Sequence, residues 1–215
     1  MALRHFLLLT VYAIAMAYVE AALVVDLRSV YYPANPLNLF PLAILSHRDL
    51  IIELVRELAT VLMIGSVAWL AARQAARVFA AFAYLFGLWD IFYYVWLKVM
   101  IGWPVHWLQW DVLYLIPWPW FGPWLAPALV ALLLVVWGAW AFLSSKPVRF
   151  ARGARLAFGA GIALLLGAFL WTGWPLLPGG VAAFRGFVPE HFPWASFAAG
   201  YLLLSLSLPR AAAVR

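Results

Sequence analysis

The chain has 215 residues, of which 68% are hydrophobic and 10% are charged, with a formal net charge of +6. A soluble domain of this length does not need so much apolar surface, so the composition indicates a protein that folds in a lipid bilayer. The sequence has no cysteine, which excludes disulfides, thiolate metal sites and thiol nucleophiles. The positive charge is typical of the cytoplasmic loops of membrane proteins and does not require a nucleic-acid partner.

Six apolar segments predict an all-α bundle of six transmembrane helices, in a single membrane domain over residues 1–215. The first segment, about residues 6–27, begins like a signal peptide, with Arg4 and the small-residue motif Ala15-Met16-Ala17. Its apolar run continues to Val25, which is long enough to span, so we expect an uncleaved helix. The other segments cover about residues 47–72, 78–99, 124–143, 155–176 and 193–208.

The basic residues predict that both termini lie in the cytoplasm. Nine of them fall on the side of the termini: Arg4, Arg73, Arg77, Lys146, Arg149, Arg152, Arg155, Arg210 and Arg215. Four fall on the other side: Arg28, Arg48, Lys98 and Arg185. Because cytoplasmic loops are enriched in Lys and Arg, we expect a multi-pass protein of the cell inner (plasma) membrane in this orientation. All eight acidic residues then fall on the outer side or in the outer part of a span.

The second span carries charge into the bilayer. It begins at Ser46, which with Asp49 forms a capping-box start. One face of this helix consists of Leu, Ile and Val, and the opposite face is polar. The residues that share the polar face are Asp49, Glu53, Arg56, Glu57 and Thr60.

Four acidic residues from three spans are predicted to reach a similar depth: Glu20, Glu53, Glu57 and Asp90. At 1.5 Å of rise per residue from the flanking polar residues, they lie about 10–17 Å below the outer surface. Arg56 is the only base at that level, so either some acids are protonated or a cation neutralises them. We therefore predict an outward-facing carboxylate site that binds a cation or a proton. The alternative is a structural ion-pair network that joins the helices.

The nature of such a site is left open by the sequence. Glu20, Glu53, Glu57 and Asp90 are candidate ligands of a divalent metal ion, since a carboxylate layer suits Mn, Mg, Ca or a di-iron centre better than copper. The Glu-x-x-His motif of di-iron bundles is missing. The layer could equally bind a cationic or hydroxylated lipid headgroup. In a small membrane enzyme or carrier, the reacting groups would be Glu53, Glu57, Asp90 and Arg56.

The third and fourth spans are joined by a Trp- and Pro-rich connection, residues 101–123, which is too short to cross the membrane again. We expect it to lie in the outer interface or to dip inward, either as an aromatic belt or as a lid over the acidic layer. The side chains predicted to contact a substrate are Tyr93 and Tyr94, one turn from Asp90, and His106 and Asp111 in the connection.

The two halves of the chain differ. Residues 1–100 carry the charged layer, whereas residues 124–215 form an apolar scaffold half. Small residues at Ala13, Ala17 and Ala21, and again at Gly159, Ala163 and Gly167, predict close helix packing. A second hypothesis follows, in which the chain is a non-catalytic subunit or assembly factor of a larger membrane complex and spans four to six contact the partner.

Three short motifs lie in or beside the charged layer: Glu53-x-x-Arg56-Glu57-x-Ala59-Thr60, Gly87-x-Trp89-Asp90-Ile91-x-Tyr93-Tyr94, and Trp110-Asp111. This succession, over spans one to four, resembles a family of small polytopic bacterial integral membrane proteins with no established activity. The resemblance implies the fold class and no reaction. The sequence has no Walker loop, dinucleotide fingerprint, HExxH or GxSxG motif.

Overall fold

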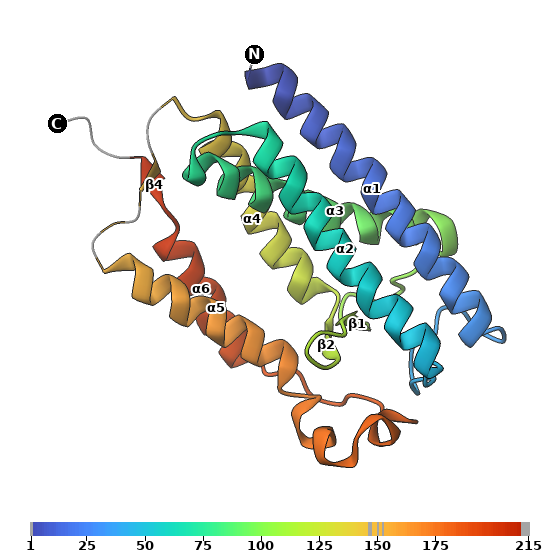
Figure 1. Cartoon of the computed structure of the whole chain (residues 1–215). Coiled ribbons are helices and arrows are strands. Elements are labelled where there is room, and N and C mark those ends of the chain that lie inside the picture. Colours follow the sequence, from blue (N-terminus) through green and yellow to red (C-terminus); the bar gives the residue numbers. More distant parts are fainter. Residues whose placement is uncertain (1, 146–147, 150, 152, 212–215) are drawn as a thin grey trace.

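A computed structural model describes the chain except for residues 1, 146–147, 150, 152 and 212–215. The described part is mostly helical (Figure 1). Its six α-helices are α1 (Ala2–Tyr31), α2 (His47–Ala71), α3 (Ala75–Ile101), α4 (Leu125–Leu143), α5 (Ala154–Leu170) and α6 (Trp194–Ser207). Each coincides with a predicted apolar segment to within a few residues.

Three of these helices are long and apolar enough to cross a membrane: Leu3–Tyr31 in α1, Ala75–Ile101 in α3 and Leu125–Leu143 in α4. Helices α5 and α6 are apolar but shorter. Helix α2 has the length but carries ionisable residues along one side. Large apolar side chains such as Val11, Leu62 and Val136 are exposed on the helices, as expected where a surface faces lipid. The six-span topology itself stays a prediction.

The prediction of an all-α fold is wrong for the connection after α3. Strands β1 (Trp110–Tyr114) and β2 (Trp120–Pro123) form an antiparallel hairpin in which Asp111 lies opposite Gly122. Pro117 and Pro119 cannot donate helical hydrogen bonds, and aromatic residues favour strands. The rings of Tyr114 and Trp120 pack across the hairpin, with centroids 5.8 Å apart. A second, minimal pairing joins β3 (Val148–Arg149) to β4 (Arg210–Ala211).

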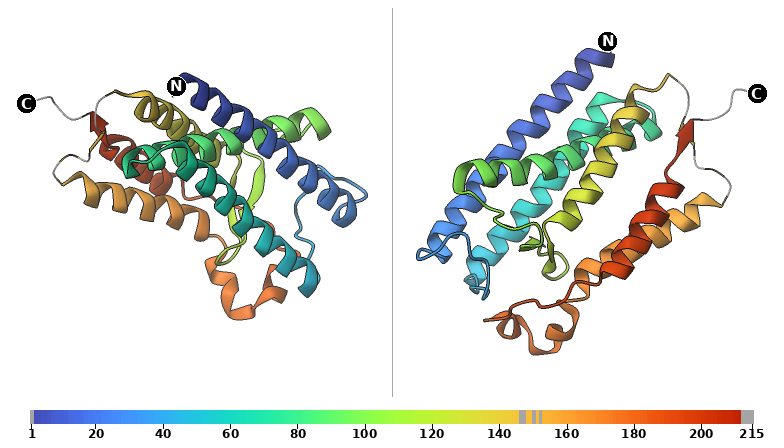
Figure 2. Two further views of the ribbon diagram at one scale, coloured as in Figure 1. Left: turned by 45° about the horizontal axis from the view of Figure 1, so that its top comes forward. Right: turned by 180° about the vertical axis from the view of Figure 1, so that it is seen from behind.

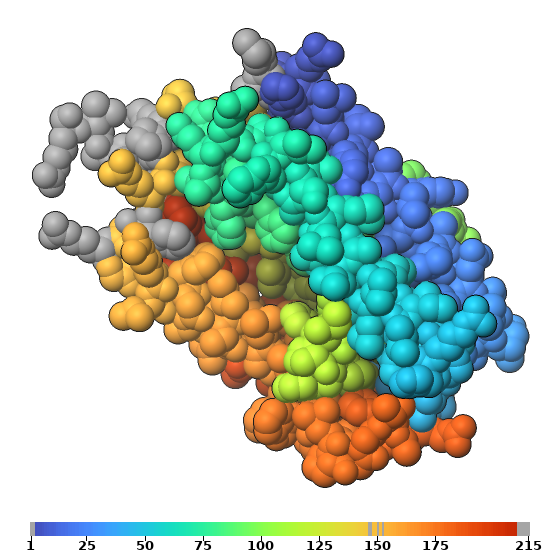
Figure 3. Space-filling model, in the orientation of Figure 1, coloured from blue at the N-terminus to red at the C-terminus, as the bar shows by residue number. Residues whose placement is uncertain are grey.

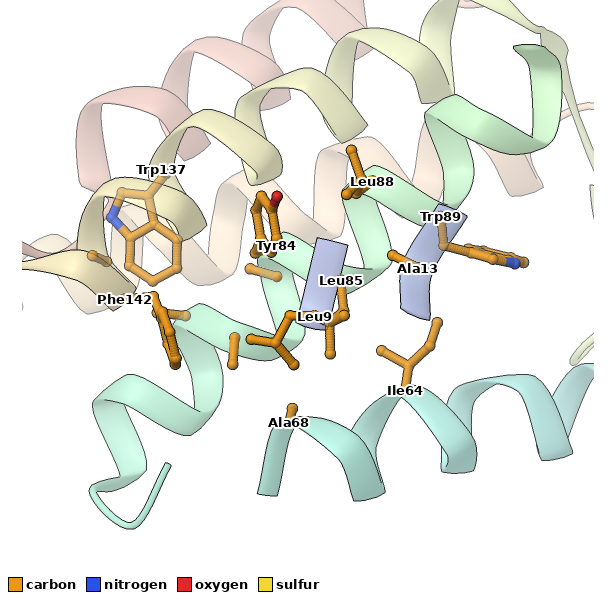
Figure 4. Close-up of a cluster of buried hydrophobic side chains, with 14 of the residues drawn as sticks. Leu9, Ala13, Ile64, Ala68, Tyr84, Leu85, Leu88, Trp89, Trp137 and Phe142 are labelled. Atoms are coloured by element: carbon orange, nitrogen blue, oxygen red, sulfur yellow. The ribbon is translucent and has the colours of Figure 1, made fainter. Parts of the chain in front are cut away.

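Helix α3 is the centre of the N-terminal bundle. Helices α1, α2 and α4 all pack on it, and Figure 4 shows the side chains that fill the contact, including Leu9 from α1, Ile64 from α2, Leu85 from α3 and Trp137 from α4. The small-residue stripe predicted in α1 is buried, with Ala13, Ala17 and Ala21 at most 1% exposed. This packing fixes the relative positions of α1, α2 and α3, which form the walls of the site described below.

Helices α5 and α6 lie side by side (Figure 2) and share a buried apolar cluster with Ala126 at the start of α4. The predicted stripe of Gly159, Ala163 and Gly167 is not their contact, because these three residues are exposed. The close approach is made by Gly161, where an added Cβ would lie 2.8 Å from the Leu204 nitrogen, and by Gly200 on α6. The stripe and Gly161 lie on different faces of one helix, and only packing against α6 decides which face is buried.

Local signals set the ends of the helices near the site. The Ser46 hydroxyl accepts a hydrogen bond from the Asp49 backbone N–H at 3.1 Å, which confirms the predicted start of α2. Helix α3 ends at Gly102, whose φ of 75° places it in the left-handed region typical of a helix C-cap. The segment between α5 and α6 contains two short 3₁₀ helices, η1 (Trp174–Gly179) and η2 (Val181–Phe184).

Candidate functional site

A cavity of about 780 Å³ lies between α1, α2, α3 and the β1–β2 hairpin. Residues of the loop after α1 and of the η1–η2 segment complete its wall. Figure 3 shows the η1–η2 segment, in orange, against the hairpin and the start of α2. The polar and charged residues of the wall are Glu20, Arg28, Tyr31, Tyr32, Glu53, Arg56, Glu57, Thr60, Asp90, Tyr93, Tyr94, Asp111 and Tyr114. The rest of the wall is mainly Leu, Val, Ile, Pro and aromatic side chains.

Arg56 joins α2 to α1. Its guanidinium is ion-paired with Glu20 on α1 and with Glu53 one turn back on α2. The Nε atom of Arg56 donates to Glu53 at 2.9 Å, and the Thr60 hydroxyl donates to Glu20 at 3.3 Å. All three charged side chains are at most 20% exposed. Two of the four predicted acids are therefore ion-paired with Arg56, whose single positive charge balances one of them.

Glu57 fastens the hairpin to α2. Its carboxylate accepts a hydrogen bond from the Leu115 backbone N–H, at 2.9 and 3.0 Å to the two oxygens. The Tyr114 hydroxyl donates to the Glu57 backbone carbonyl at 2.9 Å. Glu57 is 5% exposed. These contacts hold the hairpin against α2 in the cavity wall.

Asp90 differs from the other three acids. It lines the cavity from α3, and it makes no hydrogen bond or ion pair with any residue that the structure describes. Its neighbours on the helix are equally free of polar partners in the described chain: the Trp89 indole N–H is buried without an acceptor, and the Tyr93 hydroxyl faces the same cavity. The middle of α3 thus presents unsatisfied polar groups to the enclosed space.

A second charged group lies where α1 meets the hairpin. Arg28 is 2% exposed and its guanidinium carbon lies 4.1 Å from the centre of the Trp103 ring, a cation–π contact. Its Nη2 atom lies 3.7 Å from the Asp111 carboxylate. Asp111 also accepts from the Tyr94 hydroxyl at 3.2 Å and from the Val112 backbone N–H at 3.0 Å. Burial raises the pKa of Asp111 to about 6, although Arg28 and Tyr94 act in the opposite direction.

The cavity brings together most of the residues predicted to form a site. Those that line it are Glu20, Glu53, Arg56, Glu57, Asp90, Tyr93, Tyr94 and Asp111. His106 is exposed and is not part of the wall. Over the described residues no group of three or more His, Asp or Glu side chains is arranged to hold a metal ion, so the structure adds no support to the predicted metal site.

Sequence reasoning missed three parts of the wall. In the sequence, Arg28 stands out only as one of four basic residues on the predicted outer side, and its partner Asp111 lies far along the chain. The loop after α1 is held together by Tyr32, which donates to the Leu39 carbonyl and accepts from the Ala43 N–H, and Leu39 and Leu42 line the cavity. The η2 residues Val181 and Phe184 also reach the cavity. No local pattern marks such contacts, because they depend on the tertiary packing.

Comparison with known protein families, with curated proteins and with solved structures finds no match for this chain. The function proposed below therefore rests on the geometry of the cavity and on the apolar helices.

Proposed function

We propose that this chain is an integral membrane protein whose outward-facing cavity binds an amphiphilic molecule and holds the positive or protonated end of that molecule at Asp90. The observation that carries the proposal is the contrast among the acids. Glu20 and Glu53 are paired with Arg56 and Glu57 with the Leu115 N–H, whereas the Asp90 carboxylate faces the cavity without a partner among the described residues.

The chemistry of the wall supports an amphiphile. A half-buried carboxylate without a partner in a mainly apolar cavity is costly, so Asp90 favours either a proton or a cation beside it. The aromatic ring of Tyr93, one turn away, adds a face that attracts ammonium groups. The remaining wall, with side chains such as Leu39, Leu42 and Leu54, suits an alkyl chain. In an enzyme or a proton-coupled carrier, Asp90 would be the group that takes up and releases the proton.

Under this proposal Arg56, Glu20 and Glu53 act as a structural cross-link, and Glu57 positions the hairpin. These roles replace the catalytic and metal-binding roles that the sequence alone suggested for them. The site then needs no metal ion, and its cation is supplied by the ligand.

The test uses dodecyltrimethylammonium, a single-chain cation, added below its micellar concentration to protein in dodecyl maltoside. Native mass spectrometry counts the adducts. We expect Asp90→Asn to weaken binding about tenfold or more, as for loss of a charged partner, and Asp90→Glu to restore part of it. Asp26→Asn is the matched control, because Asp26 is exposed and outside the cavity. Equal binding by wild type and Asp90→Asn would exclude the proposal.

A further inference from the structure

Arg28 has hydrogen-bonding capacity that the described chain does not use. All three of its side-chain nitrogens are buried and have no hydrogen-bond partner among the described residues. A guanidinium has five N–H donors in a planar fork that matches phosphate and carboxylate groups. Leaving such donors buried and unbonded costs free energy, because they have lost water and gained nothing in return.

Asp111 does not satisfy Arg28. The 3.7 Å separation between Nη2 and the carboxylate is an ion-pair contact but is too long for a hydrogen bond. The Asp111 oxygens are instead used by the Tyr94 hydroxyl and the Val112 N–H. Trp103 contacts the guanidinium through its ring and accepts no conventional hydrogen bond. Trp103 and Asp111 thus position Arg28, and Asp111 partly balances its charge. The N–H donors of the guanidinium remain available for another acceptor.

Arg28 and Asp90 belong to one electrostatic cluster. Both line the same cavity. Asp111 contacts Arg28 and acts electrostatically on Asp90, and the Tyr93 hydroxyl lies within electrostatic range of both. The cavity therefore offers an unpaired carboxylate and an unbonded guanidinium on the same wall. The buried Trp89 N–H is one more donor on that wall.

We propose that the amphiphile carries a zwitterionic head group, with its phosphate oxygens bound by Arg28 and its ammonium group bound by Asp90. This inference rests on the proposed function and specifies its ligand. A purely anionic ligand would meet a cavity wall on which five acids, Glu20, Glu53, Glu57, Asp90 and Asp111, outnumber Arg28 and Arg56. A purely cationic ligand would leave the Arg28 donors unbonded. A phosphate–ammonium head group complements both charges and adds no net charge.

The experiment compares three ligands that share a dodecyl tail: dodecylphosphocholine, dodecyltrimethylammonium and dodecyl phosphate. Each is titrated below its micellar concentration into protein in dodecyl maltoside, and adducts are counted by native mass spectrometry. Wild type should bind dodecylphosphocholine about tenfold or more tightly than either single-charge ligand. Arg28→Gln should abolish the preference over dodecyltrimethylammonium, and Asp90→Asn should abolish the preference over dodecyl phosphate.

Arg48→Gln is the charge-matched control, because Arg48 is exposed and lies outside the cavity, and it should retain both preferences. If Arg28→Gln fails to fold, Arg28→Lys and the wild-type ranking decide, since lysine keeps the charge but lacks the planar set of donors and should reduce the preference.

Phosphocholine without a tail separates the two sources of such a head group. Binding of the tailless compound indicates a soluble ligand, and binding only with the tail indicates a membrane lipid.

The failures of the two proposals are distinguishable. If wild type binds dodecylphosphocholine no better than dodecyltrimethylammonium, or if Arg28→Gln keeps the preference, the zwitterion inference is wrong. The proposed function survives that result provided that dodecyltrimethylammonium binding still depends on Asp90. If it does not depend on Asp90, the proposed function itself is wrong.

Discussion

Arg56 is the residue that holds two acids, Glu20 and Glu53, in place in the cavity wall. Its pairs with Glu20 and Glu53 are mostly buried, and removing one member of such a network leaves uncompensated charge. We expect Arg56→Gln to lower the free energy of unfolding by about 3–5 kcal/mol, read as a lower melting temperature in detergent. Arg48→Gln, at an exposed position, should change it little. An unchanged melting temperature for Arg56→Gln would remove the structural role assigned to it.

The ionisation of Asp111 makes the free energy of unfolding depend on pH. Its pKa is raised by burial from 3.8 to about 6 in the folded protein, so the fold is favoured when this carboxyl is protonated. That stabilisation is present below about pH 4 and is lost as the pH rises through about 6. Asp111→Asn cannot ionise, so its stability relative to wild type should improve by about 2–3 kcal/mol between about pH 4 and about pH 7. Denaturation of both proteins across this range measures the difference, and a pH-independent difference would contradict the assignment.

At single residues, the sequence predicts the members of the site where a side chain is energetically costly to place in an apolar helix. An acidic side chain in an apolar helix, such as Asp90 or Glu20, needs either a polar partner or a cavity. Both residues line the same cavity. Prediction from the sequence failed for Arg28, because an arginine at the end of a span is ordinary and its burial under Trp103 depends on the chain folding back. It also gave no sign that Glu57 binds a backbone donor of the hairpin.

At the scale of elements, the contact between α3 and α4 depends on glycine. A Cβ added at Gly138 would lie 2.6 Å from the Tyr84 backbone nitrogen and 2.8 Å from the Ala80 carbonyl oxygen. Gly138→Ala should therefore separate the two helices and cost about 1–3 kcal/mol. Gly65→Ala is the control, since nothing lies within 4 Å of the added Cβ on α2, and helix propensity favours alanine there. The melting temperatures of the two variants should move in opposite directions.

The helices could be predicted from apolar length and charge, and the hairpin could not. Residues 110–123 are rich in aromatic residues and contain three prolines, a composition that fits an interfacial helix or a strand pair equally well until its partners are known. Glu57 and the Tyr114–Trp120 pair select the hairpin. Similarly, the small residues of α5 lie on more than one face, and only the position of α6 selects Gly161.

For the whole molecule, the proposal that the cavity faces outward depends on the predicted orientation in the membrane. Ser145 and Asn38 are both exposed, and the predicted topology places them on opposite sides of the membrane. Cysteines introduced at these positions into the naturally cysteine-free chain should react with a membrane-impermeant thiol reagent from opposite sides, with Asn38→Cys labelled from outside. Labelling of both from one side would contradict the topology.

The decisive measurement is to locate the bound amphiphile on the protein. A dodecyltrimethylammonium analogue with a diazirine at the end of its tail would be photolysed on the protein and the modified peptides mapped. We predict labelling of the cavity wall, in residues 39–45 and 113–118, and a marked loss of that labelling in Asp90→Asn but not in Asp26→Asn. Labelling confined to the outer surfaces of the helices, or unaffected by Asp90→Asn, would show that the cavity is not the binding site.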